Sequence, residues 1–420
     1  MMEIQRKRWL SFTIIPIVLF YLCEFRFFYL LPLPNKLFAG STNKNLLAVF
    51  SLFAFCYFLV RVKKFTWGQF GAVFLLIFAL VAGSTALSAI EFGYKITQVL
   101  WGIIPYLILL LYFPAKKYLA NEDIYEQFIV IGEVCTLFVS VLFVIQKIKY
   151  TGTGSVFLKL PDMIPDHYIW HPDEGIRVRN IFDGFFRVFA LILADRIIAK
   201  KFKKSLLDIL AFVSILAMIA LIDRSRQYLL IVLVSVFVIF LYRTRKKITA
   251  ALFLVGTFAV VGGIAVISGK VLSIIESILG NSGSWFARVE GVTHYLSVGL
   301  EHFFIGIGMA DPESLPAVAK YVRGAGGIYY PDDVGIVGLF ALLGVVGVTL
   351  YVFVLVRAFK TFKTSDNKAL ILGVCVCFAL SSILSSYFDR TRLTALVLTA
   401  VLCDINSKQR IRVYECDNID

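Results

Sequence analysis

The chain has 420 residues, of which 59% are hydrophobic, and its mean hydropathy is +0.83. A soluble fold of this length cannot bury so many apolar side chains, so the composition excludes a water-soluble globule and places the chain in a lipid bilayer. The net charge of +14 requires no nucleic-acid partner, because the basic residues lie between apolar stretches and form no polar domain of their own.

Twelve apolar stretches predict a single all-α, polytopic membrane domain over residues 1–420. A helix needs about 20 residues to cross about 30 Å of hydrocarbon. Several stretches are shorter than this, and the sixth contains Arg187, Asp195 and Arg196. The predicted spans are 9–23, 45–60, 69–90, 96–113, 127–146, 184–199, 206–222, 228–242, 248–268, 334–356, 369–386 and 393–405.

Basic residues alternate between the two sides of these spans. Dense clusters occupy the N-terminal segment, every second connection and the C-terminal tail; they begin at Arg6, Arg61, Lys116, Lys200, Arg243, Arg357 and Lys408. The positive-inside rule therefore predicts that both termini face the cytoplasm. The alternation also requires the sixth span, since without it the later clusters would fall on the wrong sides.

Two connections on the predicted outward side are long, namely 147–183 and 269–333. Loops longer than about 15 residues in a compact fold are usually functional. His167 and His171 in the first loop have the spacing of a helical metal pair, but prolines flank them and no third ligand follows at a recognisable distance. No metal site is predicted. The chain also has no Walker A loop and no dinucleotide fingerprint, so any chemistry is expected on the outward face.

A short connection between two apolar spans carries Asp223, Arg224, Ser225 and Arg226. Arginine at membrane depth costs a few kcal/mol, about 3 on the insertion scale, so a pair of them calls for an explanation. One interpretation is an anion site, because guanidinium groups match phosphate oxygens and the following helix presents its N-terminal N–H groups. The other is that Asp223 pairs with one arginine and that both arginines reach the headgroups. The residues alone leave both open.

The second long loop contains a predicted amphipathic helix at the membrane surface. Its apolar positions are Val289, Val292, Leu296 and Leu300. We expect this apolar face to cover the bundle. Arg288 and His294 lie on the same segment.

Asp332 and Asp333 precede the tenth span. Pro331 and the two carboxylates mark a helix start, and one aspartate is expected to cap that helix. Helix capping explains the presence of one aspartate well, but it explains a second neighbouring aspartate less well. A pair of carboxylates beside arginines can keep the pKa of one of them high enough for proton transfer.

The order of these features resembles the O-antigen polymerase and ligase superfamily. The resemblance covers roughly 206–356 and rests on their order, spacing and sidedness: Ser225 and Arg226 before a span, Arg288 ahead of an amphipathic segment, Gly306 and Gly308 after it, then Asp333 before Gly335, Gly338, Gly344 and Gly347.

The resemblance implies a fold similar to the membrane glycosyltransferases of the GT-C type and an enzyme of the bacterial cytoplasmic membrane. Such an enzyme transfers glycan from undecaprenyl pyrophosphate to a second glycan outside the cytoplasm, without metal or cofactor, in the synthesis of lipopolysaccharide or capsule. A flippase and a chain-length regulator are the implied partners. The ligase pattern has a histidine near the position of Asp332 and Asp333, so we expect a polymerase. A ligase acting on lipid A core is one alternative, and a polysaccharide or lipid transporter is the other.

Residue by residue, the resemblance and the anion hypothesis assign two roles. The expected general base is Asp333, with Asp332 and His294 as alternatives. The residues expected to bind pyrophosphate are Arg226, Arg288, Arg224, Arg177 and Arg179.

Overall fold

The computed structural model describes residues 14–25, 27, 42–63, 65–93, 95–154, 183–199, 206–223, 225–244, 283–309, 316–324, 327 and 329–407. Within these ranges the chain is helical and contains no strand, only an isolated bridge between Ser365 and Ser407. An N-terminal helix covers Ile14–Glu24. The other elements are α3 (Thr42–Arg61), α4 (Gly71–Phe92), α5 (Ile96–Ile103), η2 (Ile104–Leu111), α6 (Tyr112–Tyr118), α7 (Glu122–Thr153), α9 (Asp183–Ala199), α10 (Leu206–Ala217), η4 (Met218–Ile222), α11 (Arg226–Thr244), α14 (Gly283–Glu301), α15 (Pro316–Arg323), η5 (Pro331–Asp333), α16 (Gly335–Thr364), α17 (Lys368–Leu384) and α18 (Leu393–Ile405).

Within the described ranges, five helices are long and apolar enough to cross a membrane, which confirms an all-α membrane protein. They are Gly71–Phe92, Ile96–Tyr118, Glu122–Thr153, Gln227–Thr244 and Gly335–Thr364. Every other predicted span in the described ranges also coincides with a helix, whereas 248–268 lies outside them. The total of twelve spans remains a prediction. Helix α7 continues to Thr153, past residue 147 where the first outward loop was predicted to begin.

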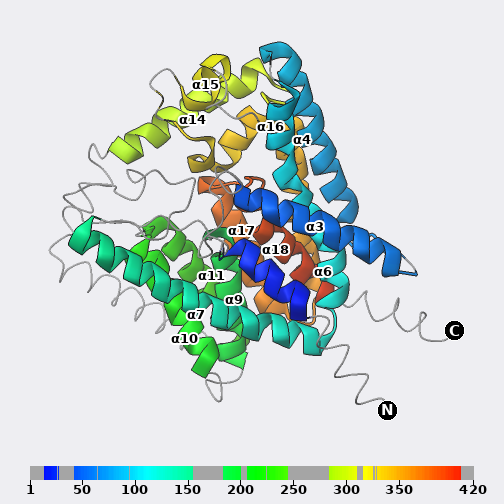
Figure 1. The fold of residues 1–420 in the computed structure, drawn as a ribbon, viewed down its shortest axis with the longest axis vertical. Helices are drawn as coiled ribbons and strands as arrows, with labels where there is room; N and C mark the ends of the chain where they lie inside the picture. The colour runs from blue at the N-terminus through cyan, green and yellow to red at the C-terminus, as the bar shows by residue number, and fades with distance from the viewer. Residues whose placement is uncertain are drawn as a thin grey trace.

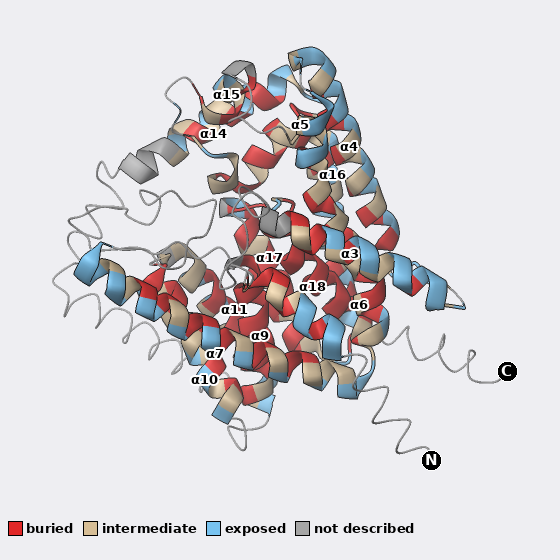
Figure 2. Cartoon of the chain, viewed as in Figure 1, coloured by how far each residue is buried: buried red, intermediate tan, exposed pale blue. Residues whose placement is uncertain are grey.

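The sixth predicted span, α9, is one of the most enclosed helices of the bundle (Figure 2). It packs against α10, α11, α17 and α18. Its charged residues are stabilised by neighbours: Asp195 accepts hydrogen bonds from Arg243 Nε and Nη2, both at 2.8 Å, and from Asn367 at 2.6 Å. Arg196 donates to Asp208 at 2.9 Å and to Glu126 at 2.5 Å. Charges inside a span are tolerated when they are paired in this way, which explains the polar residues of this helix.

Two sets of polar contacts mark opposite ends of the bundle. The first set, just described, joins the last turns of α9 and α11 to the first turns of α7, α10 and α17. The second set joins the beginnings of α9, α11 and α18 to the end of α17. This separation matches the alternation of helix ends predicted from the sequence. That the first end faces the cytoplasm is still a prediction from the basic residues.

Helix α16 is interrupted at Gly344, where φ is 63° and ψ is −166°. Residues Phe303–Gly308, which we call the strap, fill the interruption. Four backbone hydrogen bonds of 2.8–3.2 Å join the two: from Ile307 to Ala341, from Gly308 to Leu342, from Val345 to Phe303 and from Val346 to Phe304. An irregular backbone at membrane depth must satisfy its polar groups with other protein groups, and the strap does so. The strap thereby ties α14 to α16.

Helices α14 and α15 lie with the ends of α4 and α16 at the top of Figure 1, above α7, α9, α10 and α11. The predicted helix in the second loop is confirmed as α14, but of its expected apolar face only Val292 packs on the protein. Tyr295 and Val298 are buried against α15 and α16, whereas Leu296 and Leu300 are exposed. Apolar side chains occur on more than one side of α14, so periodicity alone did not identify the face that packs on protein.

Candidate active site

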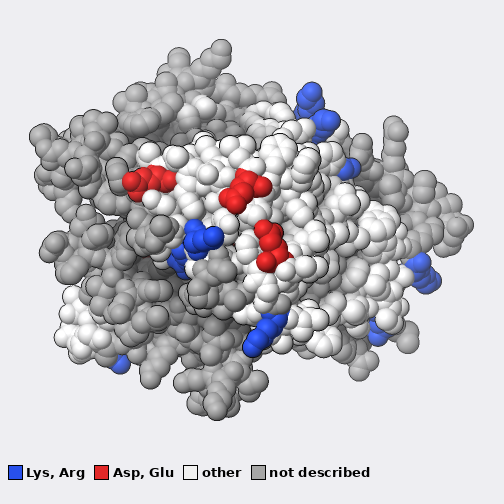
Figure 3. Space-filling view, turned by 90° about the horizontal axis from the view of Figure 1, so that it is seen from above, with Lys and Arg blue, Asp and Glu red and all other residues white. Residues whose placement is uncertain are grey.

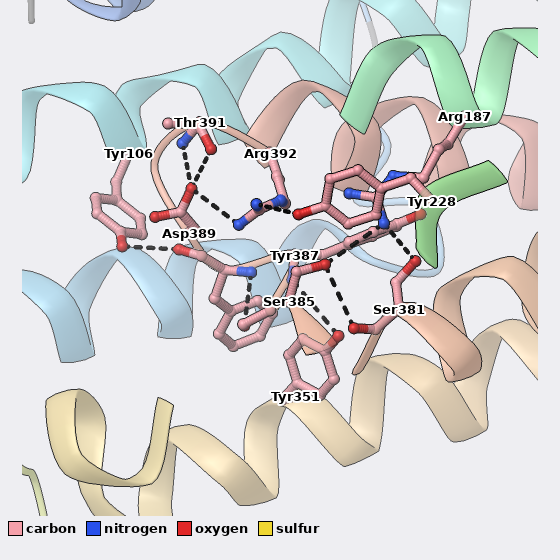
Figure 4. Close-up of polar contacts among 12 residues, drawn as sticks. Tyr106, Arg187, Tyr228, Tyr351, Ser381, Ser385, Tyr387, Asp389, Thr391 and Arg392 are labelled. Atoms are coloured by element: carbon pink, nitrogen blue, oxygen red, sulfur yellow. Dashed lines mark hydrogen bonds and ion pairs between the residues drawn. The ribbon is translucent and has the colours of Figure 1, made fainter. Parts of the chain in front are cut away.

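Four segments far apart in the sequence converge at the second end of the bundle, and Figure 4 labels side chains from three of them, α9, α11 and the connection between α17 and α18. They are the first turns of α9 and α11, the connection between α17 and α18, and the short helix η5 that precedes α16. Arg187, Tyr228, Asp332, Asp389 and Arg392 come from these segments. We call these five residues the polar cluster.

The centre of the polar cluster is a pair of carboxyl groups, Asp332 and Asp389, which share a hydrogen bond. Burial, and then the negative charge of Asp389, raises the pKa of Asp332 to about 8. Burial also acts to raise the pKa of Asp389, but the charge of Arg392 and the hydrogen bonds from Thr391 and Asp332 outweigh it and lower this pKa. Two neighbouring carboxyl groups avoid holding two negative charges. At neutral pH the pair therefore holds one proton, mainly on Asp332.

The turn between α17 and α18 positions Asp389. Its carboxylate accepts hydrogen bonds from the Thr391 backbone N–H at 2.9 Å and from the Thr391 hydroxyl. This local bonding is typical of aspartate in turns, where the side chain replaces a backbone acceptor. Arg392 Nη1 lies 3.5 Å from the same carboxylate oxygen, and Tyr106 donates a hydrogen bond to the Phe388 carbonyl at 2.8 Å. The turn is thus stabilised by its own hydrogen bonds and by the hydrogen bond from Tyr106 of η2.

Arg187 is fully buried beside the cluster, with an exposed fraction of 0%. Its Nη1 donates to Ser381 at 2.7 Å and lies 3.4 Å from the Ser385 hydroxyl. The guanidinium carbon is 4.4 Å from the ring centre of Tyr228 and 5.6 Å from that of Tyr387. A desolvated cation over an aromatic ring is stabilised by about 2 kcal/mol. Arg187 therefore fixes the Tyr228 ring against the end of α17.

Aromatic side chains of α14 pack against aromatic residues of α15 and of the segment just before η5. His294 donates its Nε2 hydrogen to the Tyr321 carbonyl at 2.8 Å, since a carbonyl can only accept. Its ring lies 5.0 Å from the ring of Tyr295 and 5.3 Å from that of Tyr329. Tyr329 donates to Glu290 at 2.9 Å. His294 is thus part of the packing between α14 and α15.

Figure 3 looks down on the end of the molecule that carries α14 and α15. The described part of this face is mostly uncharged, with acidic side chains around a basic group. Among the charged residues of the polar cluster, Arg187 and Arg392 are buried and Asp332 and Asp389 are half-buried.

The residues expected from the sequence fall into different places. Asp332 belongs to the polar cluster. Asp333 is next to it in η5, where its backbone N–H donates to the Tyr330 carbonyl at 3.1 Å. Arg288 lies half-buried on α14, and no hydrogen bond or ion pair in the described ranges joins it to Asp332 or Asp389.

Arg226 is the first residue of α11, two positions before Tyr228, and its side chain is not described. Arg224, Arg177 and Arg179 lie outside the described residues, as do His167 and His171.

The expected aspartate cap of α16 is wrong. The N-cap position belongs to Val334, which makes no side-chain capping bond. The two aspartates instead form the single turn η5 ahead of the helix. A turn of this kind takes the carboxyl groups away from the first N–H groups of α16, and Asp332 hydrogen-bonds to another carboxyl group in place of the backbone.

Sequence reasoning did not find Arg187, Asp389, Arg392 and Tyr228. Arg187 could have been found as a charge inside an apolar span, because such residues are functional candidates by default. Asp389 and Arg392 lie in a short polar connection that has the same residue types as the one beginning at Asp223. Tyr228 carries no recognisable sequence signal.

In comparisons with known proteins, no family model and no curated protein matches the chain. The fold itself defines the class: an all-α protein embedded in a membrane by several apolar helices.

Proposed function

We propose that the protein is a membrane glycosyltransferase that polymerises lipid-linked oligosaccharide repeat units on the outer face of the bacterial cytoplasmic membrane. The observation that carries this proposal is the Asp332–Asp389 carboxyl pair beside Arg392, at the end of the bundle predicted to face outward. Such a pair supplies a base near neutral pH, and the arginine supplies positive charge for an anionic leaving group. The resemblance of 206–356 to the O-antigen polymerase and ligase superfamily points to the same chemistry.

The proposed reaction is a displacement at the anomeric carbon of the donor glycan. A hydroxyl oxygen of the acceptor glycan forms the new bond to this carbon, and the bond between the carbon and the pyrophosphate oxygen breaks. The pyrophosphate of the polyprenyl carrier leaves with the electron pair. The hydroxyl proton passes to the ionised form of Asp332, which is the stronger base of the two carboxylates because its pKa is the higher.

The surroundings of the pair suit this displacement. Arg392 keeps Asp389 ionised, so Asp389 raises the pKa of Asp332 without itself taking the proton. Negative charge develops on the leaving pyrophosphate, and fixed cations in a water-poor site stabilise it. The apolar helices around the site admit the polyprenyl tail from the bilayer, because they are lipid-compatible along their length.

The surface glycan of a deletion strain tests this function. A polymerase defect leaves single repeat units on the cell surface. A full-length polymer that remains on its lipid carrier would instead identify a ligase, and lipid-linked repeat units confined to the cytoplasmic leaflet would identify a transporter.

The matched test is reconstitution of the purified protein with lipid-linked repeat units as both donor and acceptor. Formation of longer chains by the wild type, and their loss in Asp332→Asn, supports the proposal. Absence of chain growth by the wild type overturns it.

A further inference from the structure

An exposed tyrosine lies beside the carboxyl pair. Tyr330 comes directly before η5, two residues from Asp332, and has an exposed fraction of 40%. Binding sites are commonly lined by aromatic side chains with a few polar groups among them. The proposed displacement does not use Tyr330, so an aromatic ring left open at the edge of the polar cluster calls for its own explanation.

The backbone directs Tyr329 and Tyr330 to opposite sides. Tyr330 is extended, with φ of −133° and ψ of 122°, and successive side chains of an extended chain point in opposite directions. Tyr329 faces the protein, where its ring lies 5.3 Å from that of His294 and its hydroxyl donates to Glu290 at 2.9 Å. Tyr330 therefore faces away from the packing between α14 and α15.

Arg323, the last residue of α15, fixes the ring of Tyr330 from one side. Its guanidinium carbon lies 4.0 Å from the ring centre. The Tyr329 backbone N–H donates to the Arg323 carbonyl at 3.1 Å, which closes the connection after α15 and keeps the two side chains together. A binding residue that is already ordered loses less entropy when its ligand arrives. The ring of Tyr330 is thus preorganised.

The hydroxyl of Tyr295 shows that Tyr330 and the carboxyl pair share one side of α14. This hydroxyl donates to the Val322 carbonyl at 2.5 Å. Burial, and then the charge of Asp332, raises the pKa of Tyr295, whereas the charge of Arg323 lowers it, and Tyr330 is also near enough to act on it. Two residues of chain span at most about 7 Å, so Tyr330 lies within the reach of one sugar ring from Asp332.

A pyranose ring suits this arrangement. The C–H bonds on one side of such a ring carry partial positive charge, and the face of an aromatic ring is negative. Its hydroxyl groups need hydrogen-bond partners at the rim. Arg323 and Asp333 are half-buried neighbours of Tyr330, and the Asp333 backbone N–H donates to the Tyr330 carbonyl. Tyrosine also anchors proteins in lipid headgroups, but the neighbours of Tyr330 are charged protein groups.

We propose that Tyr330 is the stacking residue of the acceptor site. The sugar that carries the reacting hydroxyl lies on the ring of Tyr330, with this hydroxyl toward Asp332. This inference rests on the proposed function. It adds to that function a residue that sets the affinity for the acceptor and takes no part in proton transfer.

Binding of an oligosaccharide without its lipid tests this assignment. The probe is the oligosaccharide that mild acid releases from lipid-linked repeat units, and its affinity for the purified full-length protein in nanodiscs of zwitterionic lipid is measured by calorimetry. We expect Tyr330→Ala to weaken binding about tenfold, as for the loss of one aromatic stacking contact. Tyr330→Phe and Tyr330→Trp should stay within about twofold of the wild type, because each keeps a ring. Wild-type affinity in Tyr330→Ala overturns the assignment.

Tyr57→Ala is the matched control. Tyr57 is an exposed tyrosine too, and the guanidinium carbon of Arg61 lies 5.5 Å from its ring centre. It belongs to the last turns of α3, at the end of the bundle predicted to face the cytoplasm. Its affinity for the oligosaccharide should equal that of the wild type. Equal losses in Tyr57→Ala and Tyr330→Ala would contradict a specific role for Tyr330.

Chain-growth kinetics separate binding from positioning. Preformed lipid-linked chains are the donor and single repeat units the acceptor. Tyr330→Ala should raise the KM for the acceptor about tenfold and leave kcat and the KM for the donor within about twofold, because stacking holds the acceptor before and during the reaction alike. A lower kcat at an unchanged KM for the acceptor would mean that Tyr330 only shapes the turn around Asp332, and would overturn stacking.

Tyr330→Leu decides the matter if Tyr330→Ala does not fold, since leucine keeps an apolar side chain beside Arg323 without an aromatic face. The thermal unfolding midpoint of each variant is measured in parallel. Equal oligosaccharide affinities of folded Tyr330→Leu and Tyr330→Phe contradict stacking. Repeating the series in nanodiscs with anionic lipid identifies a headgroup anchor: a midpoint that depends on the lipid in Tyr330→Ala, with unchanged oligosaccharide affinity, also overturns the proposal.

The same variants separate this inference from the proposed function. Chain growth with a normal KM for the acceptor in every Tyr330 variant overturns the stacking site and leaves the polymerase intact. Oligosaccharide binding that depends on the Tyr330 ring, in a protein that never extends a glycan, keeps the saccharide site and removes the polymerase.

Discussion

Arg392 donates a hydrogen bond from Nη2 to the hydroxyl of Tyr228 at 3.1 Å, and so joins the turn before α18 to the first turn of α11. The same arginine lies 3.5 Å from Asp389, whose carboxylate pairs with Asp332. On its other side, the Tyr228 ring packs on the buried guanidinium of Arg187. One continuous set of contacts therefore connects α9, α11, α18 and the start of α16.

The first prediction concerns pH. Asp332 has a pKa of about 8, so a reaction that needs its ionised form should speed up as the pH rises through about 8 and then level off. Asp389→Asn removes a neighbouring negative charge that raises this pKa, so the rise should move to lower pH. Asn keeps an oxygen that can accept from Thr391, which preserves the turn. The pH–rate profile of chain growth in nanodiscs measures both.

Neighbouring variants serve as the control for that profile. Asp332→Asn should lose on the order of a hundredfold or more in rate. Asp333→Asn, one residue away in the same turn, should keep the wild-type profile. An inactive Asp333→Asn beside an active Asp332→Asn would transfer the role of the base to Asp333, as the sequence alone had suggested.

The second prediction concerns the Tyr228 hydroxyl. Tyr228→Phe removes the acceptor for Arg392 and keeps the ring against Arg187, so the stability lost should correspond to one hydrogen bond to a charged group, about 1.5–3 kcal/mol. Arg392 is then less constrained, and chain growth should slow. Tyr242→Phe is the control, because Tyr242 lies at the other end of α11 and contacts Phe362 through its ring. Equal unfolding midpoints for both variants would contradict a role for the Tyr228 hydroxyl.

The third prediction concerns the interruption of α16. The backbone of Gly344 has a conformation that is essentially restricted to glycine, with φ of 63° and ψ of −166°. Gly344→Ala should therefore cost about 1–3 kcal/mol and disturb the strap, since an added Cβ would meet the backbone of Phe304. Gly83→Ala is the matched control in the helical part of α4, where an added Cβ meets nothing within 4 Å. Thermal unfolding in detergent should separate the two, and a midpoint for Gly344→Ala equal to that of Gly83→Ala would rule out strain at this position.

The fourth prediction concerns orientation. Thr153 ends α7 and Thr364 ends α16, both are exposed, and the predicted topology places them on opposite sides of the membrane. In a background without the seven native cysteines, Thr153→Cys should react with a membrane-impermeant reagent on spheroplasts, and Thr364→Cys should react only after lysis. The reverse pattern would place the polar cluster on the cytoplasmic side and exclude the proposed outward reaction.

Local sequence was sufficient to locate the helices. Each predicted span inside the described ranges coincides with a helix. Polar backbone groups must be hydrogen-bonded in lipid, and a single helical segment forms these bonds within itself. Even α9, with four charged residues, was recovered through the alternation of basic clusters. Its tolerance of Asp195 and Arg196 became clear only from their partners on other helices.

The site was recovered only in part. Asp332 was identified because a pair of aspartates before a helix exceeds what capping requires. The cap itself was predicted wrongly and the buried face of α14 was predicted only in part, since both depend on the direction in which a turn or helix packs. The short polar connection that carries Asp389 and Arg392 was available in the sequence, but it gained meaning from the contact between Arg392 and Tyr228.

The sequence by itself determined the membrane class, the helical segments and the expected sidedness of this protein, because hydropathy and charge act over one helix or one loop at a time. The tertiary structure alone decided that Asp332 meets Asp389, 57 positions later, and that Arg187 and Tyr228 support the arginine beside them. Proximity between distant segments sets the charge and burial around a carboxyl group, and these two quantities set its pKa.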